Sequence, residues 1–128
     1  MFNITEIEKI IRLMIAQNDT ISDVTMTSGF YLFSYKKYAW VICRNRSKSN
    51  KEFTYRLIYY PYYSNVKDLS LAIDKAGKVN MGNLNHVLFK SPDSCSDKLY
   101  TLYKKLYDVI ESKLYGIDRV LEDMHEKK

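Results

Sequence analysis

Residues 30–63 hold the side chains best suited to bind another molecule, because this segment combines aromatic rings with an almost unopposed positive charge. Seven basic residues and the single acid Glu52 give the segment a net charge of +6, whereas the whole chain carries +5. The basic residues are Lys36, Lys37, Arg44, Arg46, Lys48, Lys51 and Arg56. A localised positive charge attracts an acidic partner, and aromatic rings stack on such a partner or pack a core.

The motif YYPYY at the end of this segment points to protein binding. Tyrosine, tryptophan and arginine are the residues that most often dominate the energetics of protein interfaces. Four tyrosines around one proline exceed what a small core buries with every hydroxyl satisfied, so we expect some exposed aromatic surface. The sequence predicts a small non-enzymatic interaction protein (adaptor, inhibitor or chaperone-like) that binds an acidic protein surface. The predicted contact residues are the seven basic residues together with Tyr59, Tyr60, Tyr62 and Tyr63.

Nucleic acid is the alternative partner for the same residues. Four of the basic side chains crowd one predicted hairpin loop over residues 44–51. Such a loop contacts successive phosphates with an affinity that falls steeply in salt, and tyrosines on a sheet face stack on unpaired bases. The chain has no RRM or KH signature and its net charge is moderate. The sequence therefore favours protein and leaves nucleic acid open.

Other chemistry finds little support in the residue pattern. Metal sites need several converging ligands, and the chain has only His86, His125, Cys43 and Cys95 as nitrogen and sulfur ligands. Nucleophilic catalysis needs a Cys or Ser beside a His and an orienting acid, and no spacing here indicates that arrangement. The two glycines within 76–83 lack the spacing of a phosphate-binding loop. We therefore expect no catalytic centre, metal or cofactor.

The elements that must position these residues follow from hydrophobic periodicity and from runs of aromatic and branched residues. Together they predict one α+β domain over residues 1–128, with helices packed on an antiparallel sheet. Their order is similar to that of type III secretion chaperones and profilin-like domains, in element order alone. The predicted elements are a helix over 3–17, a meander of strands over 26–35, 38–44 and 53–60, a short helix between Ser64 or Asn65 and Gly77, a strand over 84–89 and a long helix over 94–115.

Three structural questions stay open in the sequence. The strand 38–44 carries apolar groups on both faces, which fits either a sheet covered on both sides or one exposed aromatic face. The last helix has a heptad stripe that includes Tyr103, Tyr107 and Ile110, which fits packing on its own sheet or a homodimer. Gly116 either ends this helix or interrupts it at a cost of about 1 kcal/mol.

The sequence also suggests where the protein acts. No segment approaches the roughly 18 apolar residues of a transmembrane helix. Residues 1–17 have charged residues within their apolar stretch, which is typical of an amphipathic helix and not of a signal peptide. We therefore expect no membrane association and a cytoplasmic protein, either in the producing cell or in a host.

Overall fold

The protein folds as an α+β domain, as the sequence predicts. The computed structural model describes residues 4–27, 29–46, 53–76, 87–90, 97–116 and 124. Within these residues no helix combines the length and apolar character needed to cross a membrane. The elements are α1 (Ile4–Ala16), the 3-10 turn η1 (Asn18–Thr20), β1 (Ser22–Thr27), β2 (Phe30–Tyr35), β3 (Tyr38–Arg46), β4 (Phe53–Tyr60), α2 (Val66–Ala76), β5 (Val87–Lys90) and α3 (Asp97–Tyr115).

The five strands form one antiparallel sheet in the order β1-β2-β3-β4-β5. The predicted single strand over 26–35 is wrong, because the chain reverses within it and pairs Thr27 with Phe30. Gly29 makes this reversal feasible, since its φ of 83° lies in the left-handed region that glycine adopts without strain. The meander therefore has four strands where the sequence predicts three, and β1 becomes one edge of the sheet.

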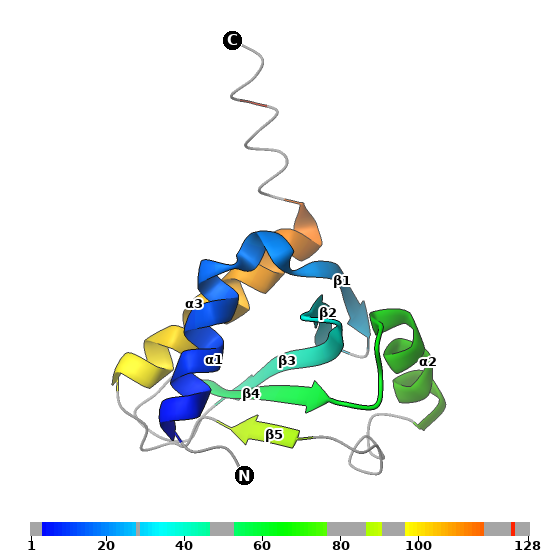
Figure 1. The fold of residues 1–128 in the computed structure, drawn as a ribbon, viewed down its shortest axis with the longest axis horizontal. Coiled ribbons are helices and arrows are strands. Elements are labelled where there is room, and N and C mark those ends of the chain that lie inside the picture. The colour runs from blue at the N-terminus through cyan, green and yellow to red at the C-terminus, as the bar shows by residue number, and fades with distance from the viewer. Residues whose placement is uncertain are drawn as a thin grey trace.

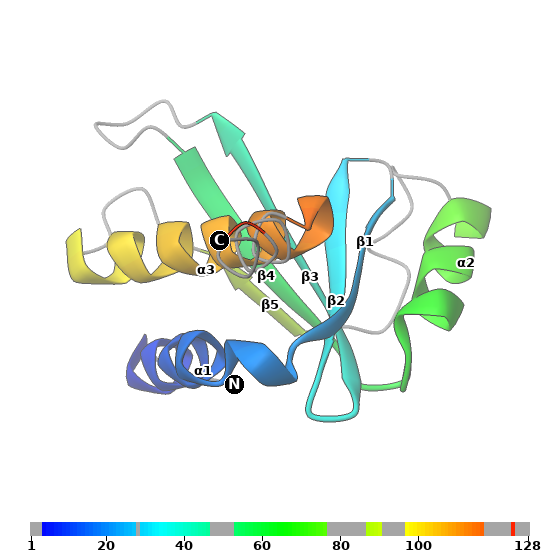
Figure 2. The same cartoon turned by 90° about the horizontal axis from the view of Figure 1, so that it is seen from above.

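Helices cover both faces of the sheet. Figures 1 and 2 show α1 and α3 lying side by side across one face, with α2 against the β1–β2 part of the other. Alternating residues of the strands therefore enter two separate cores. The core beneath α1 and α3 includes Phe33, Trp40, Ile42, Tyr55 and Leu57. The core beneath α2 includes Leu32, Val41, Ile58 and Tyr60 together with Val66, Leu69 and Ile73 of the helix. Of the two interpretations of β3, the covered sheet is confirmed.

The long helix α3 uses its heptad stripe to pack on the sheet of the same chain. Tyr103, Tyr107 and Ile110 are buried in the core shared with α1. The ring of Tyr55 stacks on that of Tyr103, with 6.1 Å between centroids and 11° between planes. The helix ends at Tyr115, because Gly116 has a φ of 68° and turns the chain out of the helical path. The predicted strand residues 84–86 and helix residues 94–96 lie outside the described residues.

The N-terminus of α2 is fixed by Asn65, which settles the choice between two predicted caps. The Asn65 side-chain oxygen accepts the Asp68 backbone N–H at 2.8 Å, and the Asn65 amide donates to the Asp68 carboxylate at 3.0 Å. This reciprocal pairing satisfies an N–H group that the first helical turn leaves unpaired. A hydrogen bond of 2.8 Å between the hydroxyls of Thr27 and Ser70 then ties α2 to β1.

Candidate functional site

Antiparallel pairing of β3 with β4 places the predicted binding residues at two opposite ends of the sheet. Ala39 pairs with Tyr60 at one end, and Arg46 pairs with Phe53 at the other. These pairs are seven residues apart along β3, which at about 3.3 Å per residue makes roughly 23 Å. Figure 2 shows the turn between β2 and β3 on the opposite side of the molecule from the far end of this ladder. Arg44 and Arg46 therefore lie toward the opposite end of the β3–β4 ladder from Tyr59 and Tyr60 of the YYPYY motif.

The turn between β2 and β3 consists of Lys36 and Lys37, closed by the pairing of Tyr35 with Tyr38. Both lysines are exposed and both have left-handed backbones, with φ of 54° and 68°. A two-residue hairpin turn of this kind favours Asn-Gly. A residue other than glycine held there costs on the order of 1–3 kcal/mol. Within the described residues neither lysine forms an ion pair, so both charges face solvent.

Three aromatic rings line up beside this turn. The Tyr59 ring stacks on Trp40 with 4.6 Å between centroids, and its other neighbour is Tyr38, edge-on at 5.3 Å. The indole N–H of Trp40 donates to the Tyr35 carbonyl at 3.2 Å, which anchors the inner end of the row. Burial raises the pKa of Tyr59, and Tyr38 beside it adds to the effect.

Tyr38 is 42% exposed and belongs to this surface, although the sequence did not single it out. Its position directly after the two-residue turn is the signal that could have found it.

The YYPYY motif divides between core and surface. Tyr60 is only 1% exposed in the core beneath α2, and burial raises its pKa to about 12. Tyr63 is partly buried and packs edge-on against Tyr60 at 6.2 Å. The Tyr63 carbonyl accepts the Ala39 N–H at 3.1 Å, which holds the end of the motif beside the start of β3. Tyr62 is 75% exposed. The expected exposed aromatic surface is therefore present at Tyr62 and absent at Tyr60.

At the other end of the sheet the arginines contact rings. The half-buried Arg44 places its guanidinium 4.1 Å from the centroid of Phe53 and 4.3 Å from that of Tyr107 on α3. Cation–π contacts of this kind contribute about 0.5–2 kcal/mol, more when water is excluded. Arg46 is exposed and lies farther from Phe53, at 5.9 Å. Arg44 therefore links the β3–β4 hairpin to α3, and Arg46 is accessible to a partner.

The half-buried Glu111 and the phenols of Tyr31 and Tyr55 complete this end of the core. The Tyr31 hydroxyl donates to the Glu111 carboxylate at 2.7 Å. Burial, followed by this hydrogen bond, raises the pKa of Tyr31. Burial also raises the pKa of Tyr55, while Arg44 beside it acts in the opposite direction. These side chains form a polar aromatic core that joins α3 to the strands.

Of the three remaining predicted residues, the structure describes Arg56. Arg56 pairs with Cys43 in the register of β3 and β4, and is half-buried on the sheet face opposite α1 and α3. Its Nε is buried and has no hydrogen-bond partner within the described part of the chain. The Cys43 side chain is buried. Lys48 and Lys51 lie outside the described residues.

Lys36, Lys37 and Tyr38 are exposed at the turn between β2 and β3, and Tyr59 is partly buried beside Tyr38. Tyr62 is exposed in the segment after β4, which the hydrogen bond from the Ala39 N–H to the Tyr63 carbonyl holds beside the start of β3. We define these five residues as the turn patch. No three His, Cys, Asp or Glu side chains converge to hold a metal within the described ranges. No family model, curated protein or solved structure matches this chain. The fold and the site together define an α+β domain with a basic aromatic surface at one end of a sheet that is covered on both faces.

Proposed function

We propose that the protein is a non-enzymatic binding protein, of adaptor, inhibitor or chaperone-like type, that attaches to an acidic protein surface through the turn patch. The observation that carries this proposal is the strained turn. Lys36 and Lys37 occupy left-handed positions where Asn-Gly would cost less, and both charges face solvent. Backbone strain of this kind clusters at ligand-binding sites. The proposed setting is the cytoplasm of the producing cell or of a host.

The patch supplies both parts of a binding surface. Exposed charges steer the diffusional encounter and mainly raise the association rate. Tyrosines add rigid contact area, and interface hot spots are enriched in them. The row of Tyr38, Tyr59 and Trp40 is anchored in the core, so little side-chain freedom is lost when a partner covers it. Arg44 contributes less than the sequence suggests, because its guanidinium already stacks on two rings.

Nucleic acid is the second candidate, and the same patch would bind it by stacking bases on Tyr38 and Tyr62. Affinity for nucleic acid depends on the number of phosphates that are neutralised. The turn patch holds two lysines, and Arg44 and Arg46 lie toward the other end of the β3–β4 ladder. Two phosphate contacts release about two counterions, which gives weak binding at physiological salt. The geometry therefore favours the acidic protein.

A photo-crosslinking experiment tests the proposal. The photoreactive residue benzoylphenylalanine replaces Tyr62 in one variant and Tyr115, an equally aromatic and exposed position on α3, in the other. We expect an acidic protein to crosslink at position 62 and not at 115. The double substitution Lys36→Glu and Lys37→Glu should abolish the crosslink and lower the association rate at least about tenfold. The matched control is Lys104→Glu with Lys105→Glu, an exposed lysine pair on α3 with the same change in net charge.

Three results would contradict the proposal. Equal crosslinking at both positions would show that the turn patch has no special role. An equal loss in the Lys104 and Lys105 control would show that only total charge matters. Crosslinked nucleic acid in place of protein, with an affinity that drops by orders of magnitude between about 50 and 200 mM salt, would establish the second candidate.

A further inference from the structure

The edge strand β1 has a hollow on each side, and this observation is independent of the turn patch. The first hollow, of about 660 Å³, lies between β1 and α2. The second, of about 490 Å³, lies between β1 and the C-terminal end of α3. Asp23 and Val24 of β1 line both hollows. Volumes in this range are typical of ligand sites.

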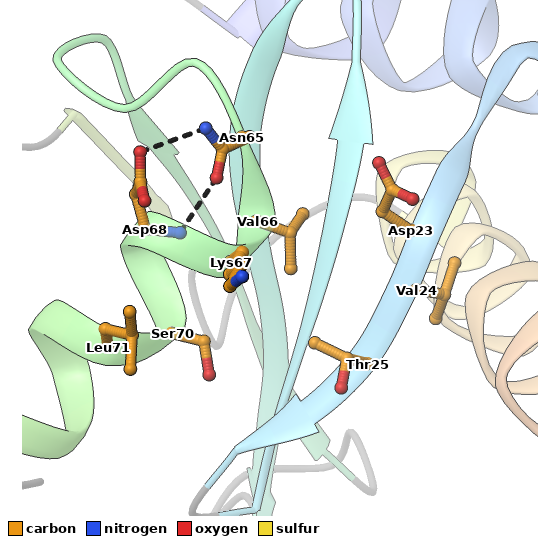
Figure 3. A pocket seen from close by; sticks show the side chains of 9 residues that line it. All are labelled: Asp23, Val24, Thr25, Asn65, Val66, Lys67, Asp68, Ser70 and Leu71. Atoms are coloured by element: carbon orange, nitrogen blue, oxygen red, sulfur yellow. Dashed lines mark hydrogen bonds between the residues drawn. The ribbon is translucent and has the colours of Figure 1, made fainter.

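The hollow beside α2 combines an apolar wall with an acidic rim. Figure 3 shows Thr25 on the side of β1 that faces Val66 and Ser70 of α2, whereas Val24 points to the other side of β1, toward the core beneath α1 and α3. Leu71 of α2 also lines the hollow. Leu71 is 60% exposed, which leaves an aliphatic side chain in solvent.

The rim adds charge to this wall. The carboxylates of Asp23 and Asp68 also line the hollow, against the single ammonium of Lys67. The local charge is therefore negative in a chain whose net charge is +5.

β1 also offers backbone groups to a further strand. It pairs with β2 along one edge, and within the described residues no strand pairs with its other edge. Edge strands with free N–H and C=O groups are templates for strand addition. Successive side chains of an added strand point to opposite faces. An added strand would therefore point one set of alternate side chains toward the hollow beside α2 and the other set toward the hollow beside α3. Both hollows have space for these side chains.

We infer that β1 is a docking edge for an extended peptide segment that adds to the sheet as a sixth strand. Aliphatic side chains at alternate positions of this segment enter the hollow beside α2, where they cover the exposed Leu71. A lysine or arginine of the segment faces Asp23 and Asp68. A second copy of this chain fits less well, because pairing β1 with β1 would bring two acidic rims together.

A bulge limits the length of this edge. The register between β1 and β2 shifts between Ser22 and Thr25, and Asp23 there has a φ of 55°. Regular pairing covers Thr25 to Thr27. Bulges and charged residues are the devices by which edge strands avoid indiscriminate aggregation. The docked segment therefore makes a short ladder, and its specificity comes from the hollow beside α2.

Selection of peptides tests this inference on the whole protein. Random octapeptides displayed on phage are panned against the wild-type chain, and the best is synthesised with a fluorescent label for anisotropy titration. We expect aliphatic residues at alternate positions and at least one lysine or arginine. Leu71→Glu should weaken binding at least about tenfold, because it removes most of the aliphatic contact. The matched control Leu13→Glu alters an exposed leucine on α1 and should leave the affinity unchanged.

Two further measurements separate strand addition from other binding. Asp23→Asn removes one rim charge at a left-handed position that asparagine tolerates, and should weaken binding several-fold at low salt. Hydrogen exchange, read by mass spectrometry, should slow across residues 22–27 when the peptide binds. The inference is overturned if no peptide is selected, if Leu13→Glu weakens binding as much as Leu71→Glu, or if exchange in β1 does not change. Selection of acidic peptides that no longer bind after Lys36→Glu would also overturn it, because they report the turn patch.

Discussion

The two ends of the β3–β4 ladder contain the same kinds of side chain in different surroundings. At one end Arg44 stacks on Phe53 and on Tyr107 beneath α3, and its cation is half-buried. At the other end Lys36 and Lys37 form a turn in which both side chains are exposed, and their charges face solvent. Basic and aromatic residues alternate at both ends of the segment, so composition does not distinguish them.

The difference shows what separates a structural cation from a binding cation. The contacts of Arg44 with rings that exclude water stabilise the fold. A partner can contact only the part of the guanidinium that these rings leave accessible. The Lys36 ammonium lies 5.7 Å from the centroid of the Tyr35 ring, farther than either ring contact of Arg44, and the backbone of both turn lysines is strained. A residue held in a strained position by weak contacts is a better candidate for function than one that holds the core together.

The largest expected effect is at the Arg44 end. Arg44→Glu should lower the free energy of unfolding by about 2–4 kcal/mol, because it places an unpaired carboxylate among rings and near Glu111. Arg44→Met should cost less, since it keeps the packing and removes only the charge. Urea denaturation measures both changes. Arg46→Glu is the control and should stay within about 0.5 kcal/mol. Equal effects at Arg44 and Arg46 would mean that burial does not distinguish the two arginines.

An intermediate effect is expected from the buried phenols at alkaline pH. Burial raises the pKa of Tyr60 to about 12, compared with about 10 in the unfolded chain. The folded state therefore holds the phenolic proton more tightly, so the stabilisation is fully present below pH 10 and is lost as the pH rises toward 12. Linkage predicts a loss on the order of 2–3 kcal/mol over this interval. Tyr60→Phe should remove this part of the slope, and Tyr62→Phe should not. Unfolding curves at several pH values between 9 and 12 measure it.

The smallest effect is expected at the turn, and it has the opposite sign. The double substitution Lys36→Asn and Lys37→Gly should raise the free energy of unfolding by about 1 kcal/mol. It relieves left-handed strain, and part of that gain is offset by the greater flexibility of glycine in the unfolded chain. The same variant should lose its partner in the crosslinking experiment. A fall in stability would show that the lysines are not strained, and would remove the main support for the proposed site.

Much of the architecture follows from local patterns. The periodic apolar residues of α1 and α3 predict both helices nearly to their ends. The choice that the sequence leaves open at Gly116 is decided by the structure, where α3 ends at Tyr115. The aromatic runs predict β3 and β4 with similar accuracy. The reversal at Gly29 escaped the prediction, because one glycine amid strand-forming residues is a weak turn signal. The sequence also did not predict that Tyr60 is buried and Tyr62 exposed, because the four tyrosines around one proline share the same local pattern.

The sequence by itself determined the α+β class and the presence of a basic aromatic segment. These properties depend on periodicity and composition, which act over a few residues. Only the tertiary structure decided that Arg44 stacks beneath α3 while Lys36 and Lys37 face solvent, and that β1 is an edge with a hollow on each side. The register of β3 with β4 and the placement of α3 determine these features. Both depend on contacts between residues far apart in the chain, and no local pattern contains that information.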